Sequence, residues 1–294
     1  MAALATGTVV ANGLEFAYLH AGGGDTARPL ALCLHGFPDT AHGWRHLLPA
    51  LDNAGFRVIA PFQRGYSPTQ VPADGCYQSG ALGVDANSLH EALGGGSDAV
   101  IIGHDWGAAG THTAAVLEPD RWRRVVTMAL PPGTALALGF LTNLEQIQNS
   151  WYMFFFLHGL ADLVVQANDL AFIDRLWAQW SPGYDATVDL PMVKAALRDP
   201  ANLAAALGYY RATLGDGKRD DRYADAQRAT QEVPTQPMLY LHGRDDGCIG
   251  VDVAHSAAAS VSPNVSVEII DNAGHFLHLE QPELVNARIV KFLT

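Results

Sequence analysis

The sequence predicts an α/β protein with a mostly parallel sheet, helices on both faces of the sheet and an inserted α-helical lid. Short apolar runs alternate with segments of helical periodicity through residues 1–132. This is the pattern of parallel strands joined by helices. Residues 133–235 show helical periodicity without a clear strand, and two more strands and a helix follow in residues 236–294. We therefore expect a core of two parts, 1–132 and 236–294, with a lid at 133–235.

The individual elements follow in chain order. An N-terminal hairpin turns at Asn12-Gly13, a preferred two-residue turn, and a glycine-rich loop begins at 22–24. The remaining core strands are expected at 30–34, 56–61, 99–102, 125–130, 238–243 and 265–270. Core helices are expected at 44–51, 82–93, 108–117 and 281–293, and lid helices at 144–166, 170–180 and 192–214.

One junction between a strand and a helix carries the chemistry. The apolar run 99–102 leads into Gly103 to Gly107, which reads Gly-His-Asp-Trp-Gly, and a helix follows. The frame Gly-x-nucleophile-x-Gly in this setting is the nucleophile elbow of α/β-hydrolases, which lifts its middle residue into a cleft. That residue is Asp105, where esterases carry serine. A carboxylate that attacks a saturated carbon forms an ordinary ester, so Asp105 indicates alkyl transfer.

Two later loops supply the other members of a catalytic triad. In this fold the nucleophile, acid and histidine follow in that chain order, each after a strand. The loop after 238–243 contains Asp245 and Asp246, and the loop after 265–270 contains His275. His275 would activate water to hydrolyse the ester, while one of the two aspartates holds its tautomer. The backbone N–H groups of Phe37 and Trp106 are the expected oxyanion hole.

Several motifs resemble those of the α/β-hydrolase-fold epoxide hydrolases. They are His35-Gly36-Phe37-Pro38, Arg64-Gly65-Tyr66, the His-Asp-Trp-Gly run at 104–107, and Gly274-His275-Phe276. The resemblance spans essentially the whole chain and implies conversion of an epoxide and water to a vicinal diol. It also implies a cis peptide before Pro38, and it favours Asp246 over Asp245 as the triad acid.

Epoxide hydrolases of this family carry two lid tyrosines that hold the epoxide oxygen. The contexts Ser150-Trp151-Tyr152 and Tyr209-Tyr210-Arg211 resemble theirs, which implies that Tyr152 and Tyr210 fill this role. An alkoxide that forms on carbon needs a proton donor, and phenols can supply one. Tyr184 and Tyr209 are the competing tyrosines, and Tyr209 should point to the other side of its helix.

A substrate pocket lined by apolar side chains is expected around this site. Its expected residues are Phe37, Trp106, Trp151, Phe155 and Phe276. His35 and His104 are interpreted as structural groups that brace their turns by hydrogen bonds. His278 follows the catalytic loop, and a structural role is favoured over that of a second base.

Two other functions use the same features. A haloalkane or haloacetate dehalogenase shares the aspartate elbow and the Asp-His-Asp triad, and the indole of Trp106 could donate to a halide. Haloacetate enzymes typically have arginine after the nucleophile, and haloalkane enzymes commonly have asparagine or tryptophan at the position of Phe37, so both are disfavoured. A non-catalytic binding protein is disfavoured because it needs no ordered nucleophile, acid and base.

Composition limits the partners and the compartment. A net charge of −12 argues against nucleic acid and anionic membranes as partners. The N-terminus lacks a signal-peptide pattern, and the most apolar segment, 151–165, is too short to span a bilayer. Cys33, Cys76 and Cys248 lack metal or disulfide spacing, and the twelve histidines are scattered. We expect a cytoplasmic enzyme without metal or cofactor that acts on a small apolar epoxide, and a homodimer is compatible with the sequence.

Overall fold

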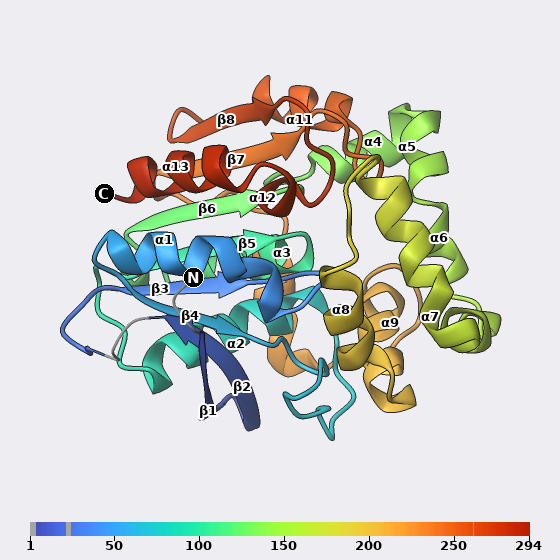
Figure 1. Cartoon of the computed structure of the whole chain (residues 1–294), viewed down its shortest axis with the longest axis horizontal. Coiled ribbons are helices and arrows are strands. Elements are labelled where there is room, and N and C mark those ends of the chain that lie inside the picture. Colours follow the sequence, from blue (N-terminus) through green and yellow to red (C-terminus); the bar gives the residue numbers. More distant parts are fainter. Residues whose placement is uncertain (1–3, 22–24, 261) are drawn as a thin grey trace.

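The computed structural model describes residues 4–21, 25–260 and 262–294, so the start of the predicted glycine-rich loop, 22–24, lies outside the described residues. One eight-stranded sheet has the strand order β1-β2-β4-β3-β5-β6-β7-β8 (Figure 1). Its strands are β1 (Ala5–Ala11), β2 (Leu14–Ala21), β3 (Leu30–Leu34), β4 (Arg57–Pro61), β5 (Val100–His104), β6 (Arg124–Met128), β7 (Met238–Gly243) and β8 (Val265–Ile270).

The sheet is mostly parallel, as the sequence predicts. The pairs β1–β2 and β2–β4 are antiparallel, and every other pair of neighbours is parallel. The antiparallel hairpin at the N-terminus turns at Asn12 and Gly13, which both have positive φ. A two-residue turn of this kind matches the twist of the paired strands.

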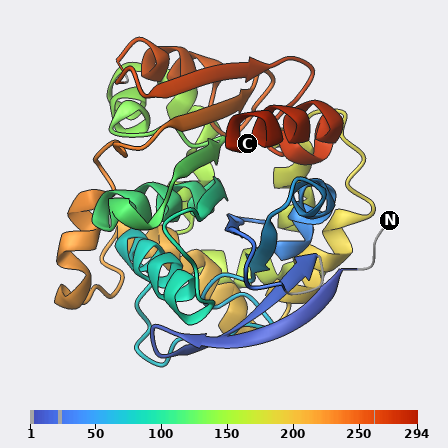
Figure 2. The same cartoon turned by 90° about the vertical axis from the view of Figure 1, so that its left-hand side faces the viewer.

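Both faces of the sheet are covered by helices (Figure 2). Each central strand divides its side chains between two apolar layers. In β5, Val100 and Ile102 belong to one layer and Ile101 to the other. The first layer includes side chains of α1 (Leu47–Asn53) and α13 (Pro282–Leu293). The second includes side chains of α2 (Ser79–Ala92), α3 (Trp106–Leu117) and α11 (Val251–Ala258). Burial on both faces explains why these strands are continuous apolar runs in the sequence.

The described chain between β6 and β7 forms helices and no strand. They are α4 (Ala135–Thr142), α5 (Leu144–Asn149), α6 (Trp151–Phe155), α7 (Leu160–Trp180), α8 (Asp189–Leu197), α9 (Pro200–Leu214), η3 (Asp221–Tyr223) and α10 (Ala224–Ala229). Helices α4 to α9 lie at the end of the sheet to which the parallel strands point (Figure 1). Backbone angles leave the helical range at 167–170, between the two lid helices predicted there. In contrast, α10 packs against α2 and α3 of the core.

Short elements complete the chain: η1 (Ala41–His46), η2 (Pro119–Arg121) and α12 (Leu277–Glu280). No helix in the described ranges combines the length and apolar character needed to cross a membrane. All three cysteines are unpaired and buried.

Candidate active site

Asp105 occupies a sharp turn between β5 and α3. Its backbone has φ 53° and ψ −121°, outside the regions that L-residues ordinarily adopt. Close packing leaves no side-chain room at the next glycine, because a Cβ on Gly107 would lie 2.0 Å from the Leu34 carbonyl oxygen. Strain of this kind at a non-glycine residue is typical of functional sites. The backbone therefore has the predicted elbow geometry, with Asp105 at its apex.

The loop after β3 places a backbone donor against the apex carboxylate. The Phe37 N–H donates to Asp105 Oδ1 at 2.7 Å, and the Phe37–Pro38 peptide is cis, as the resemblance implies. A Cβ on Gly36 would lie 2.3 Å from the same oxygen. The glycine thus permits the close approach that brings the Phe37 N–H to Asp105.

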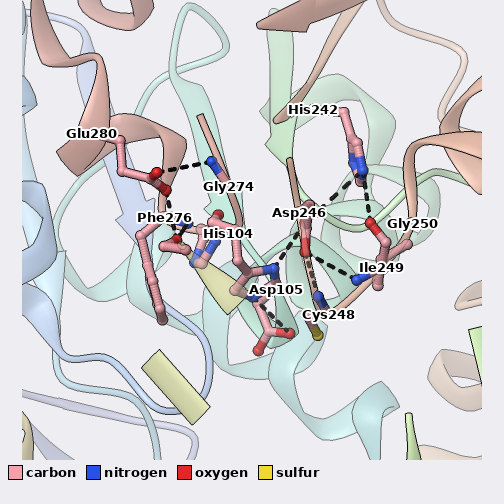
Figure 3. A network of polar contacts seen from close by, with 12 residues as sticks. His104, Asp105, His242, Asp246, Cys248, Ile249, Gly250, Gly274, Phe276 and Glu280 are labelled. Atoms are coloured by element: carbon pink, nitrogen blue, oxygen red, sulfur yellow. Dashed lines mark hydrogen bonds and ion pairs between the residues drawn. The ribbon is translucent and has the colours of Figure 1, made fainter. Parts of the chain in front are cut away.

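The three predicted triad residues come together in space. His275 Nε2 lies 3.7 Å from Asp105 Oδ2, and His275 Nδ1 lies 3.0 Å from Asp246 Oδ2. The other Asp246 oxygen accepts the N–H groups of Cys248 and Ile249 at 2.7 and 3.0 Å (Figure 3). Asp245, the competing acid, is exposed to solvent. The geometry therefore joins Asp246, rather than Asp245, to His275.

Burial and neighbouring charges set the protonation of this group. Burial raises the pKa of Asp105 to about 6, although His275 and the N–H groups of Phe37 and Trp106 act in the opposite direction. Burial alone would lower the pKa of His275, but the carboxylates of Asp246 and Asp105 outweigh it and raise the pKa above its ordinary value. A carboxylate at Asp105 and an imidazole poised to exchange a proton thus coexist near neutral pH.

Contacts from outside the triad hold its loops in place. The carbonyl of Trp180, at the C-terminal end of α7, accepts the N–H of His275 at 3.0 Å and that of Gly247 at 3.1 Å. Glu280 accepts from the Gly274 N–H at 2.9 Å and the Ser181 hydroxyl at 2.6 Å (Figure 3). One lid carbonyl therefore ties the base loop to the acid loop, a link that the sequence does not reveal.

The remaining motif histidines are buried. His35 Nε2 accepts the Gln63 N–H at 3.0 Å, and His104 Nε2 donates to the His275 carbonyl at 2.9 Å. His278 packs against the rings of Trp44 and His104. Two clusters among the described residues bring side chains of metal-ligand type close together. One consists of Asp39, His104 and His278. The other consists of Asp246, Cys248 and His275.

Both predicted lid tyrosines line the same cavity as Asp105. The Tyr152 hydroxyl lies 3.3 Å from Cys248 Sγ, and the Tyr210 hydroxyl has no hydrogen-bond partner among the described residues. The two competing tyrosines are engaged elsewhere. Tyr209 donates to the Arg64 carbonyl at 2.7 Å, and Tyr184 donates to Asp189 at 2.8 Å. The structure therefore separates Tyr152 and Tyr210 from the other candidates.

The cavity has a volume of about 250 Å³ and a mainly apolar lining. Of the five expected pocket residues, Trp106 lines the cavity, whereas the Phe37 side chain is not part of the lining and its ring packs 5.3 Å from the Tyr210 ring. The lining also includes residues that no sequence motif marks: Leu130, Leu136, Phe140, Met153, Cys248 and Ile249.

Three of the expected pocket residues lie elsewhere. Trp151 and Phe155 pack against Phe172 and do not line the cavity. They are four residues apart on α6 and so share one face of the helix, whereas Tyr152 lies on another. Phe276 also lies outside the lining, because its ring stacks on Trp177 at 3.7 Å.

Comparisons with known proteins agree with this geometry. The family model described as alpha/beta hydrolase fold matches residues 29–282. Epoxide hydrolase A of Mycobacterium tuberculosis is 29% identical over 312 residues, covering 96% of this chain and 95% of the relative. Epoxide hydrolase 4 of Mus musculus is 28% identical over 290 residues, covering 96% and 77%.

Solved structures give the same result. An epoxide hydrolase from metagenomes of hot environments aligns with a TM-score of 0.82 and 25% identity, covering 99% of both chains. A point mutant of a Bacillus megaterium epoxide hydrolase aligns with a TM-score of 0.81 and 25% identity, covering 98% of this chain and 99% of that one.

The match to the family model covers most of the chain, so the protein belongs to the α/β-hydrolase fold family. Within that family, the relatives reported above carry the name epoxide hydrolase, which confirms the resemblance that the motifs indicate.

Proposed function

We propose that the protein is an epoxide hydrolase that converts an epoxide and water to a vicinal diol through an ester on Asp105. The observation that carries the proposal is the shared cavity: a carboxylate and two phenols, Tyr152 and Tyr210, line one apolar space. A carboxylate facing hydroxyl donors is the arrangement that ring opening requires, since one epoxide carbon is attacked while its oxygen gains negative charge.

In the first step Asp105 Oδ2, the oxygen not bound to the Phe37 N–H, attacks an epoxide carbon. The carbon–oxygen bond of the ring breaks, an ester forms, and the epoxide oxygen takes a proton from the lid phenols. Burial raises the pKa values of Tyr152 and Tyr210 well above the ordinary value, so both phenols carry their protons before reaction.

In the second step His275 removes a proton from water, and the water oxygen adds to the ester carbonyl. The developing oxyanion accepts hydrogen bonds from the N–H groups of Phe37 and Trp106. When the intermediate collapses, the imidazolium of His275 returns its proton to the departing alkoxide, and the diol leaves with the original Asp105 oxygen. Esterification removes the Asp105 charge that helps to raise the pKa of His275. The imidazole is therefore neutral over a wider pH range in the ester than in the free enzyme, which suits a base.

The cavity favours small, mainly apolar epoxides, because its polar groups gather around Asp105 while its walls are largely hydrocarbon. A mutant of the Bacillus megaterium epoxide hydrolase has been solved with its product, a naphthyloxy-propanediol, so aryl-substituted epoxides are suitable first probes. The absence of a nucleic-acid partner, a possible homodimer and the cytoplasmic location remain predictions from the sequence.

One observation favours a second function. Trp106 lines the cavity, and its buried Nε1 makes no well-formed hydrogen bond among the described residues, although the indole acts on the neighbouring Tyr210 hydroxyl. An indole N–H in this position can donate to a halide. A dehalogenase would use the same Asp105 and His275. Phe37 supplies no second side-chain donor, however, and a departing halide needs no phenol to protonate it.

A substrate panel distinguishes the two functions. Purified protein is incubated with styrene oxide, aliphatic epoxides, haloalkanes and fluoroacetate, and both diol and halide release are measured. We expect diol from at least one class of epoxide. Faster halide release than diol formation would replace the epoxide hydrolase with a dehalogenase.

A further inference from the structure

The two lid tyrosines differ in what surrounds their hydroxyl groups. Cys248 Sγ lies 3.3 Å from the Tyr152 hydroxyl, and both residues are at most 2% exposed. The Tyr210 hydroxyl, at 1% residue exposure, lines the same cavity and makes no well-formed hydrogen bond among the described residues. The side chain beside it is the Trp106 indole, whose ring lies 5.1 Å from the Tyr210 ring and whose N–H acts to lower the pKa of Tyr210. A substrate oxygen between them would therefore meet one phenol backed by a thiol and one that is not.

The sulfur of Cys248 is held in place from two sides. Its backbone N–H donates to the triad acid Asp246 at 2.7 Å, and its carbonyl accepts from the buried Gln146 of α5 at 3.0 Å. The same glutamine accepts the Gly250 N–H at 2.9 Å. The acid loop and the lid thus fix the backbone of Cys248, so that its sulfur meets the tyrosine in one geometry.

The chemistry of the pair indicates which atom donates. Burial raises the pKa of Cys248 well above the ordinary value, so the group is a thiol and has a proton to give. A thiol sulfur is a weak acceptor, and an epoxide oxygen is a better one for the phenol proton. With substrate bound, the S–H therefore donates to Tyr152 Oη, while the phenol proton points to the substrate.

We propose that Cys248 is a positioning residue that makes Tyr152 the proton donor in ring opening, whereas Tyr210 only hydrogen-bonds the same oxygen. The inference rests on the proposed function. As the ester bond to Asp105 forms and the ring carbon–oxygen bond breaks, the proton moves from Tyr152 to the epoxide oxygen. The S–H then donates to the phenolate. Hydrolysis of the ester leaves one proton of the added water on the Asp105 carboxyl, and the phenolate recovers that proton when the diol leaves.

The test is a double-mutant cycle on the alkylation step. Rapid-quench alkylation of Asp105 by styrene oxide is measured for Cys248→Ala and Cys248→Ser, alone and combined with Tyr152→Phe or Tyr210→Phe. Cys248→Ala should slow alkylation by about 2- to 10-fold, the scale of one neutral hydrogen bond, and Cys248→Ser should restore it because serine keeps a donor. The effect should vanish in Tyr152→Phe and persist in Tyr210→Phe. Ester hydrolysis should not change.

Cys76→Ala is the matched control, because it removes a buried thiol that does not line the cavity. It should alkylate at the parent rate. An equal effect of Cys248→Ala in both phenylalanine backgrounds, or slower ester hydrolysis, would overturn the inference and assign Cys248 a role through the Asp246 loop. A parent protein that forms neither ester nor diol with any epoxide would refute the proposed function itself, before any variant is compared.

Discussion

Replacing the triad acid by its amide tests how the structure sets the histidine tautomer. In Asp246→Asn the side-chain oxygen must keep the place of Oδ1, since the N–H groups of Cys248 and Ile249 both donate there. The amide NH₂ then faces His275 Nδ1, where a carboxylate oxygen lay at 3.0 Å. An NH₂ donor requires a lone pair on Nδ1, so the proton moves to Nε2. The nitrogen nearest Asp105 then has no lone pair with which to accept a proton from water.

The size of the effect follows from this reversal. An acid-to-amide change that fixes the wrong histidine tautomer costs about 10⁴-fold in a related triad, and we expect ester hydrolysis to fall by about 10³- to 10⁴-fold. Alkylation uses the Asp105 carboxylate and the lid phenols, and it should change by less than about 10-fold. Intact-mass spectrometry should therefore show Asp246→Asn accumulating as the alkyl-enzyme, one substrate mass heavier than the free protein.

Asp245→Asn provides the matched control, because this neighbouring aspartate is exposed. It should hydrolyse the ester at the parent rate. Ester hydrolysis within about 10-fold of the parent in Asp246→Asn would refute the tautomer argument, since the wrong tautomer costs far more. A large loss in Asp245→Asn would identify that residue as the acid instead.

Three further predictions follow from the site and the core. Burial raises the pKa of Asp105 to about 6, and only its carboxylate attacks. The rate of single-turnover alkylation should therefore be constant above that pH and fall about tenfold per pH unit below it. A rate that stays flat down to about pH 4 would contradict this. Tyr152→Phe and Tyr210→Phe should each slow alkylation by about 10- to 1000-fold and spare ester hydrolysis, and the double variant should nearly lose ring opening; parent-rate alkylation by the double variant would disprove the role of the phenols. Asp85→Ala should lower the free energy of unfolding in urea by about 3–5 kcal/mol, because it leaves the buried Arg64 guanidinium without its carboxylate partner. The control is an exposed ion pair: Asp271→Ala, opposite Arg244, should cost less than about 1 kcal/mol. Equal losses for the two variants would contradict the role of burial.

Much of the core could be predicted because its strands are buried on both faces. The strands 30–34 and 238–243 are buried along their whole length and have the predicted bounds. The strand 265–270 also has the predicted bounds, although it is an edge strand with polar residues at 266 and 268, because β-branched residues alternate with them. The triad could be located because a parallel sheet brings the loops after successive strands to one edge. Asp105, Asp246 and His275 thus meet in space although they are far apart in the chain.

The rest of the site depends on features that residue types do not carry. The orientation of α6 about its own axis decides that Tyr152 faces the cavity and Trp151 does not. This orientation could not be predicted, because a short segment rich in aromatic residues has no hydrophobic periodicity that distinguishes its faces. Trp180 acts through its backbone carbonyl, which every residue possesses. Cys248 has no motif spacing, so only the folded structure shows that its sulfur lies beside a lid phenol.

The most direct test of the covalent ester is a single turnover in water enriched in heavy oxygen, with enzyme in excess over a styrene-type epoxide. The diol and the peptide that contains Asp105 are then analysed by mass spectrometry. The account predicts an unlabelled diol and one heavy oxygen in the Asp105 carboxylate, because water adds to the ester carbonyl and the diol leaves with the original aspartate oxygen. Heavy oxygen in the diol from the first turnover, with none in Asp105, would show that water attacks the epoxide directly and would contradict the account.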